Sequence, residues 1–129
     1  MPAAAAIHTL IVDDQASMRA LIRTSLQQLG FREFREAGDG EAGLRQMIAQ
    51  PAHLIISDFN MPNLDGLGLL RAIRAHPPTA GAAFIMLTGR ADRDLVARAV
   101  QFGVNNYLVK PFTSAILRGK IEQVIGKLS

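Results

Sequence analysis

The stretch LIISDFNMPNLDG, residues 54–66, begins with an apolar run and continues into a polar loop. Residues 54–56 have the uninterrupted apolar character of a strand that is buried on both faces. Asp58 follows this run, and residues 60–66 contain the turn-forming residues Asn, Pro and Gly. Asp65 precedes an apolar helical stripe and is a suitable N-cap. The stretch therefore places Asp58 where a buried strand ends, which is where open α/β sheets bind ligands.

Strand and helix patterns alternate along the rest of the chain. Besides the strand at Leu54–Ile56, apolar runs predict strands at Ile7–Val12, Phe31–Glu36, Ala83–Thr88 and Asn106–Lys110. Amphipathic patterns predict five helices that begin near Ser17, Asp39, Asp65, Asp92 and Thr113, with inward side chains that include Leu21, Ile48 and Val100. Strict alternation predicts an α/β fold: a doubly wound parallel sheet with helices on both faces. We expect one domain over residues 1–129, with residues 1–6 flexible.

The composition excludes several classes of protein and site. The 129 residues suffice for one domain, and none is cysteine, which excludes disulfides and thiolate metal sites. The net charge is +3, but the basic residues are dispersed and do not form an aromatic-interleaved patch typical of nucleic-acid binding. No apolar run approaches the roughly 20 residues of a membrane helix, and no secretory signal is visible. We therefore expect a cytoplasmic protein that neither binds nucleic acid nor inserts into a membrane.

Polar residues stand at the ends of four predicted strands: Asp13 and Asp14, Asp58, Thr88, and Lys110. If the strand order is 2-1-3-4-5, all five groups face one crevice. Two carboxylates about 4 Å apart repel by about 4 kcal/mol at an effective dielectric near 20, and raised pKa values, the lysine or a divalent cation can offset this. Carboxylate oxygens suit Mg²⁺, and a lysine with a hydroxyl suits phosphoryl oxygens. The arrangement predicts a carboxylate that accepts a phosphoryl group.

Five motifs carry a resemblance to a known family. They are VDD at residues 12–14, SMR at 17–19, SDFNMPNLDGL at 57–67, LTG at 87–89 and YLVKPFT at 107–113. Over essentially its whole length the chain resembles the receiver domain of two-component response regulators, and most of all the stand-alone chemotaxis members of that family. The resemblance implies a flavodoxin-like sheet of five strands in the order 2-1-3-4-5 with five helices, and a cis peptide bond between Lys110 and Pro111.

The resemblance also implies a role for each residue that matches the family's motifs. Asp58 would accept the phosphoryl group from a histidine kinase. The metal would be Mg²⁺, held by the acidic residues Asp13, Asp14 and Asp58 and by the backbone carbonyl of Asn60, with Asp13 orienting metal-bound water.

A second group of residues would sense the phosphoryl group. Lys110 and Thr88 would contact its oxygens, Thr88 would move toward it, and Tyr107 would turn inward. These movements would reshape the face formed by the fourth helix, fifth strand and fifth helix, where partners of the family bind. Gln15, Gly89 and Arg90 depart from the familiar pattern, are expected to rim the site, and bear on the lifetime of the acyl phosphate and on phosphatase docking.

Several functions fit these residues. We expect a monomeric signalling protein, not an enzyme in the usual sense, that takes part in its own phosphorylation and autodephosphorylation. Its partners would be a histidine kinase, an output protein such as a flagellar motor switch, and a phosphatase. The alternatives are a receiver module that serves a larger or separate transcription or enzyme system, and a stand-alone phosphorelay intermediate. A flavin carrier is disfavoured because Asp13 and Asp14 would repel a flavin phosphate, and an aspartyl phosphatase because Gln15 stands where a second acid is expected.

Overall fold

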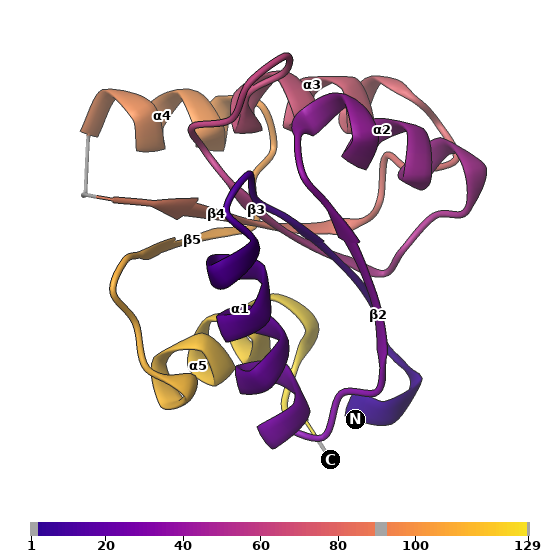
Figure 1. Ribbon diagram of the computed structural model, residues 1–129. Helices are drawn as coiled ribbons and strands as arrows, with labels where there is room; N and C mark the ends of the chain where they lie inside the picture. Colours follow the sequence, from indigo (N-terminus) through magenta and orange to yellow (C-terminus); the bar gives the residue numbers. More distant parts are fainter. Residues whose placement is uncertain (1–2, 90–92, 129) are drawn as a thin grey trace.

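The sheet has the predicted number of strands and the predicted order. The computed structural model describes residues 3–89 and 93–128, and its five parallel strands follow the order β2-β1-β3-β4-β5 (Figure 1). The strands are β1 (His8–Val12), β2 (Glu33–Ala37), β3 (Leu54–Asp58), β4 (Ala83–Thr88) and β5 (Asn106–Val109). Every residue of β3 and β4 is buried, as expected for strands covered on both faces. Strands β1 and β3, which are adjacent, are where the winding direction reverses.

Helices cover both faces of this sheet. They are α1 (Ala16–Gln28), α2 (Gly40–Ala49), α3 (Gly66–Ala75), α4 (Arg93–Gln101) and α5 (Ser114–Ile125). Helices α1 and α5 lie on one face, and α2, α3 and α4 lie on the other (Figure 1). Each layer encloses its own group of buried apolar side chains, one around Ile11, Ile56 and Leu117, and the other around Leu10 and Phe84. The fold is therefore the three-layer arrangement that the alternating pattern predicts.

Polar side chains fix the starts of three helices. Asp39, Asp65 and Thr113 each accept a hydrogen bond from the backbone N–H three residues later. Such a bond satisfies one of the unpaired donors of the first turn and is worth about 1 kcal/mol. The predicted starts at these three residues are confirmed, whereas the predicted start at Asp92 lies outside the described residues. Helix α3 is of functional interest because its cap belongs to the loop that follows Asp58.

Three predicted inward side chains are in fact exposed. Leu21 is 49% exposed, Ile48 51% and Val100 61%, so the prediction for them is wrong. A helix that packs on a sheet buries only a narrow stripe, and in α1 this stripe is formed by Ile22, Ser25 and Leu26. Residues that flank the stripe still satisfy a helical period, and the sequence alone does not show where the contact ends.

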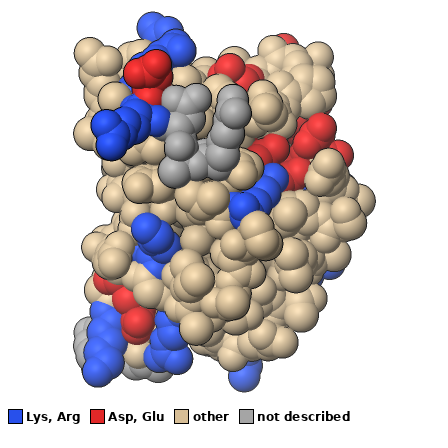
Figure 2. All heavy atoms as spheres, turned by 90° about the vertical axis from the view of Figure 1, so that its left-hand side faces the viewer, with Lys and Arg blue, Asp and Glu red and all other residues tan. Residues whose placement is uncertain are grey.

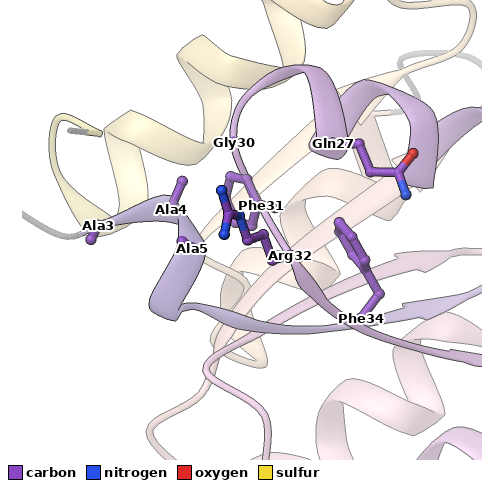
Figure 3. Close-up of a pocket in the computed structure, with 8 residues that line it drawn as sticks. All are labelled: Ala3, Ala4, Ala5, Gln27, Gly30, Phe31, Arg32 and Phe34. Carbon is purple, nitrogen blue, oxygen red and sulfur yellow. The ribbon is translucent and has the colours of Figure 1, made fainter.

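The start of the chain contains a short helix. The flexibility of residues 1–6 stays a prediction, and within them Ala4–Ala6 form a 3-10 helix and Ala4 is only 2% exposed. Ala3, Ala4 and Ala5 line a pocket of about 510 Å³, opposite the turn that leads into β2 (Figure 3). Alanine side chains are small enough to pack against that turn, and Ala4 lies beside Gly30 within it. The pocket lies at the amino ends of β1 and β2, away from the carboxyl ends where the predicted site is.

The predicted strand ends shift by one or two residues. Strand β2 begins at Glu33, two residues after the predicted start at Phe31, and β5 ends at Val109, one residue before the predicted end at Lys110.

Among the described residues, no helix combines the length and the apolar character that crossing a bilayer requires.

Candidate functional site

Backbone hydrogen bonds extend the sheet past the residues that carry the candidate site. The N–H of Asp13 donates to the last residue of β2 at 3.1 Å, and the N–H of Lys110 donates to the last residue of β4 at 2.8 Å. The N–H that follows Asp58 donates to β4 at 2.9 Å. The three side chains therefore start from backbone that is bonded to a neighbouring strand, which fixes their positions more firmly than a free loop would.

Three carboxylates meet at the carboxyl ends of β1 and β3. One oxygen from each of Asp13, Asp14 and Asp58 lies within 4.8 Å of the other two. Asp13 is fully buried and Asp58 is 7% exposed, whereas Asp14 is exposed to solvent. Charges about 5 Å apart repel by about 3 kcal/mol at an effective dielectric near 20, so this cluster is costly without a nearby cation.

Lys110 supplies one positive charge to the cluster. Its Nζ lies 2.8 Å from Oδ1 of Asp58 and 3.5 Å from Oδ2 of Asp13. Burial lowers the pKa of Lys110, but the hydrogen bond and charge of Asp58, together with Asp13, outweigh it and raise this pKa above its ordinary value. Three carboxylates and one ammonium group leave a formal charge of −2 at the site. The lysine therefore offsets only part of the repulsion.

The pKa of Asp13 also depends on burial, hydrogen bonds and nearby charges that act in opposite directions. Burial raises the pKa of this carboxyl above its ordinary value, and the charge of Asp58 raises it further. The N–H of Gln15, which donates to Oδ1 of Asp13 at 2.9 Å, and the nearby Lys110 act in the opposite direction. Burial has the largest effect, so the ionised form of Asp13 lowers the stability of the folded protein.

The donor set fits a hard divalent cation. All three side chains offer carboxylate oxygens, the ligand type that Mg²⁺ prefers, and two charges would neutralise the remaining formal charge. Within residues 3–89 and 93–128 no cysteine or histidine joins this cluster, so its chemistry does not favour a soft metal.

A close backbone approach shapes the loop after Asp58. The N–H of Gly66 donates to the carbonyl of Phe59 at 2.8 Å, which brings the start of α3 against the end of β3. A Cβ atom at Gly66 would lie 2.6 Å from the carbonyl oxygen of Asp58 and 2.7 Å from Sδ of Met86. Real Cβ atoms essentially never approach other atoms so closely, so only glycine fits here.

Gly66→Ala is expected to destabilise the protein by about 1–3 kcal/mol, because the backbone of the Asp58 loop must move to admit a methyl group. Gly119→Ala is the matched control: a Cβ there meets no atom within 4 Å, and alanine favours a helix. The control should be neutral or more stable by up to about 1 kcal/mol. Urea unfolding followed by circular dichroism measures both, and equal stabilities of the two variants would show that the loop is not tightly packed.

The other predicted site residues follow the same strands but differ in how deeply they are buried. Thr88 is buried at the end of β4, and its carbonyl accepts the N–H of Lys110. Asn60 is exposed in the loop after β3, and Gln15 and Gly89 are exposed after β1 and β4. Arg90 lies outside the described residues. The predicted cis peptide bond between Lys110 and Pro111 is present.

Tyr107 lies on β5, away from the acids. The strand pairs it with Met86 of β4, its ring is half-buried, and Nζ of Lys120 lies 4.9 Å from the ring centroid. Figure 2 shows the side of the molecule on which α4, β5 and α5 lie, and its basic groups form separate patches there. Tyr107 therefore belongs to a surface and not to the acidic cluster itself.

Sequence reasoning gave Arg19 no role, although it identified the SMR motif that contains this residue. Nη1 of Arg19 donates to the carbonyl oxygen of Asp13 at 2.7 Å, and its Nε lies 3.1 Å from Glu36 on β2. The contacts join α1 to β2 and to Asp13, the residue after β1. No local pattern in the sequence indicates that an arginine on α1 reaches both.

Known proteins are similar to this chain in sequence and in fold. The family model described as "Response regulator receiver domain" matches residues 9–122. A "Probable chemotaxis protein CheY" from Rhizobium etli is 53% identical over 128 residues, which cover 99% of each chain.

Two solved structures are similar in both sequence and backbone. The chemotaxis protein CheY4 of Vibrio cholerae is 30% identical with a TM-score of 0.85, over 92% of this chain and 98% of that one. The receiver domain of a sensor histidine kinase from Pseudomonas aeruginosa is 31% identical with a TM-score of 0.84, over 94% and 98% of the two chains. In that second structure a magnesium ion is coordinated in the active-site cleft.

Proposed function

Because the chain belongs to the response regulator receiver family and is a receiver domain of the CheY type, we propose that it is a phosphorylation-dependent signalling protein whose acceptor is Asp58. The observation that carries this proposal is the 2.8 Å contact between Lys110 Nζ and Asp58 Oδ1 within a cluster of three acids. Asp58 then has a nucleophilic oxygen and a backbone held by the sheet, and the ammonium group of Lys110 is close enough to contact a phosphoryl group on that oxygen.

The phosphoryl transfer uses one carboxylate oxygen of Asp58. This oxygen forms a bond to the phosphorus atom of the donor, and the bond between phosphorus and the donor's leaving atom breaks. The leaving group, a histidine ring nitrogen of a kinase or the acetate of acetyl phosphate, keeps the electron pair. Lys110 remains protonated and moves its ion pair from Asp58 to an oxygen of the new acyl phosphate, and the hydroxyl of Thr88 is a second donor to that group.

The acids would hold Mg²⁺ beside the acceptor. Asp13, Asp14 and Asp58 provide carboxylate oxygens, and the backbone carbonyl of Asn60 is proposed as a further ligand. When bound, the ion supplies positive charge that stabilises the phosphoryl oxygens during transfer. The similarity to a receiver domain that coordinates magnesium supports this assignment.

The output of the protein is proposed to be a protein contact. Thr88 and Tyr107 lie on adjacent strands, so a shift of Thr88 toward the phosphoryl group can be followed by movement of the Tyr107 ring. The surface of α4, β5 and α5 would change as a result and bind an output protein. Chemotaxis is the favoured pathway because two similar relatives are named as chemotaxis proteins. We also propose that the protein acts in the cytoplasm. Its phosphoryl donor would be a histidine kinase, and a phosphatase would be a further partner.

Labelling of the purified protein by acetyl [³²P]phosphate tests the acceptor function. We expect label to appear with Mg²⁺ and to be absent with excess EDTA, because three crowded acids repel an incoming phosphate when no divalent cation is bound. The label should also be released by hydroxylamine, which cleaves acyl phosphates but not phosphoserine. Labelling that persists in EDTA or resists hydroxylamine would refute an acyl phosphate at this site.

A further inference from the structure

Arg19 on α1 connects the acidic cluster to the edge of the sheet. Its Nη1 donates to the carbonyl oxygen of Asp13 at 2.7 Å, and its Nε lies 3.1 Å from Oε1 of Glu36. The other carboxylate oxygen of Glu36 is paired with Arg23, one helical turn further along α1. The side chains of Arg19 and Glu36 are 21% and 22% exposed, so this pair is shielded from solvent on most sides.

The carbonyl that Arg19 binds is part of the peptide unit that joins Asp13 to Asp14. A peptide unit is planar, so fixing its oxygen fixes the direction in which the chain leaves toward Asp14. The side chain of Asp13 also holds this segment, because its Oδ1 accepts the N–H of Gln15 at 2.9 Å and closes a turn around Asp14. Asp14 is exposed, and its side chain has no hydrogen bond or ion pair with any residue in 3–89 or 93–128, so its position depends on this turn.

We infer that Arg19 is a positioning residue for Mg²⁺ binding: its guanidinium group fixes the Asp13–Asp14 peptide, and Glu36 fixes the guanidinium. This inference rests on the proposed function, because it assigns a task to Arg19 at the same metal site. Among the described residues, Arg19 has no hydrogen bond or ion pair to the side chains of Asp13, Asp14 or Asp58, because its contacts are to the carbonyl of Asp13 and the side chain of Glu36. Its part is to keep two carboxylates pointing at one ion.

The charge of Arg19 and its positioning role predict opposite changes in Mg²⁺ affinity when Arg19 is replaced. Arg19 is a cation close to the site, so loss of its charge alone should strengthen the binding of Mg²⁺. Loss of a group that orients metal ligands should weaken that binding, and such outer contacts typically contribute a factor of about 10–100 in metal affinity. The sign of the change therefore separates a positioning role from a purely electrostatic one.

Isothermal titration of the purified protein with MgCl₂ tests the inference. We expect Arg19→Met to bind Mg²⁺ about tenfold more weakly than the unaltered protein. Arg19→Lys keeps the charge but replaces the planar fork of Nε and Nη1 with one ammonium group, which does not hold Glu36 and the Asp13 carbonyl in the same fixed geometry, so it should also bind about tenfold more weakly. Arg118→Met is the matched control, since Arg118 pairs with Glu122 on α5 and is 48% exposed. The control should change the affinity by less than about twofold.

Thermal unfolding without Mg²⁺ accompanies each titration and shows that the variants are folded. If either Arg19 variant binds Mg²⁺ as tightly as the unaltered protein, or more tightly, the positioning role is wrong while the proposed function stands. If the unaltered protein itself does not bind Mg²⁺, the proposed function fails and the inference fails with it. Weaker binding by both Arg19 variants, with Arg118→Met unchanged, supports the inference.

Discussion

Asp58→Asn is expected to abolish labelling by acetyl phosphate in the presence of Mg²⁺. The amide that replaces the carboxylate has no anionic oxygen to attack phosphorus, and no other described acid has an ammonium group at 2.8 Å. The substitution preserves the shape of the side chain, so the fold should remain. Scintillation counting of the purified protein should show a loss of at least about 100-fold, the size expected when a nucleophile is removed.

Asp65→Asn is the matched control for this experiment. Asp65 lies in the same loop, is exposed, and caps α3 by accepting the N–H of Gly68 at 2.8 Å. Asparagine caps helices about as well as aspartate, so labelling should stay close to that of the unaltered protein. Equal labelling of Asp58→Asn and Asp65→Asn would mean that the acceptor is a different residue.

Asp13→Asn is expected to make the metal-free protein more stable and to weaken Mg²⁺ binding. Asp13 is fully buried beside Asp14 and Asp58, and an asparagine keeps the hydrogen bond to the N–H of Gln15 without the charge. Repulsion between close carboxylates is about 3 kcal/mol at this separation, and Lys110 already offsets part of it. We therefore expect a gain of about 1–2 kcal/mol in urea unfolding at pH 7 with EDTA, and a loss of at least about tenfold in Mg²⁺ affinity.

The stability gain of Asp13→Asn should depend on pH. Burial raises the pKa of Asp13 in the folded protein above its value in the unfolded chain, so the folded state binds a proton more readily. At a pH above the raised pKa both states are ionised and the buried charge costs its full amount. As the pH falls below the raised pKa, the folded protein takes up the proton first, and the cost declines until the unfolded chain is protonated as well. The advantage of the variant should shrink on acidification, and an advantage that grows, or a variant that is less stable at pH 7, would contradict the account of crowded acids.

The sequence predicted the elements that are governed by strong local patterns. The apolar runs that end at Val12, Ile56 and Thr88 gave the central strands, because a strand buried on both faces needs a continuous apolar segment. Once the strands are parallel, their carboxyl ends must share one edge of the sheet. The meeting of Asp13, Asp14, Asp58 and Lys110 could therefore be predicted before any coordinates, although the strand order was taken from the family resemblance.

Features that depend on packing between distant segments could not be predicted in this way. Val100 fits the helical period of α4 yet is 61% exposed, because the width of the buried stripe is set by the neighbouring layer. Ala4 is buried although alanine-rich ends commonly fray, because it fits against the turn before β2. Arg19 reaches the carbonyl of Asp13 and the side chain of Glu36 only after α1 has packed beside the sheet.

The contact between Lys110 and Asp13 spans 97 residues of sequence. During synthesis all three acids leave the ribosome long before the lysine does, and a nascent chain therefore carries them without their counter-charge. Asp58, the proposed acceptor, gains its 2.8 Å contact with Lys110 only when β5 has docked at the edge of the sheet. Under the proposed function, a chain that lacks β5 also lacks Lys110, the ammonium group that contacts Asp58.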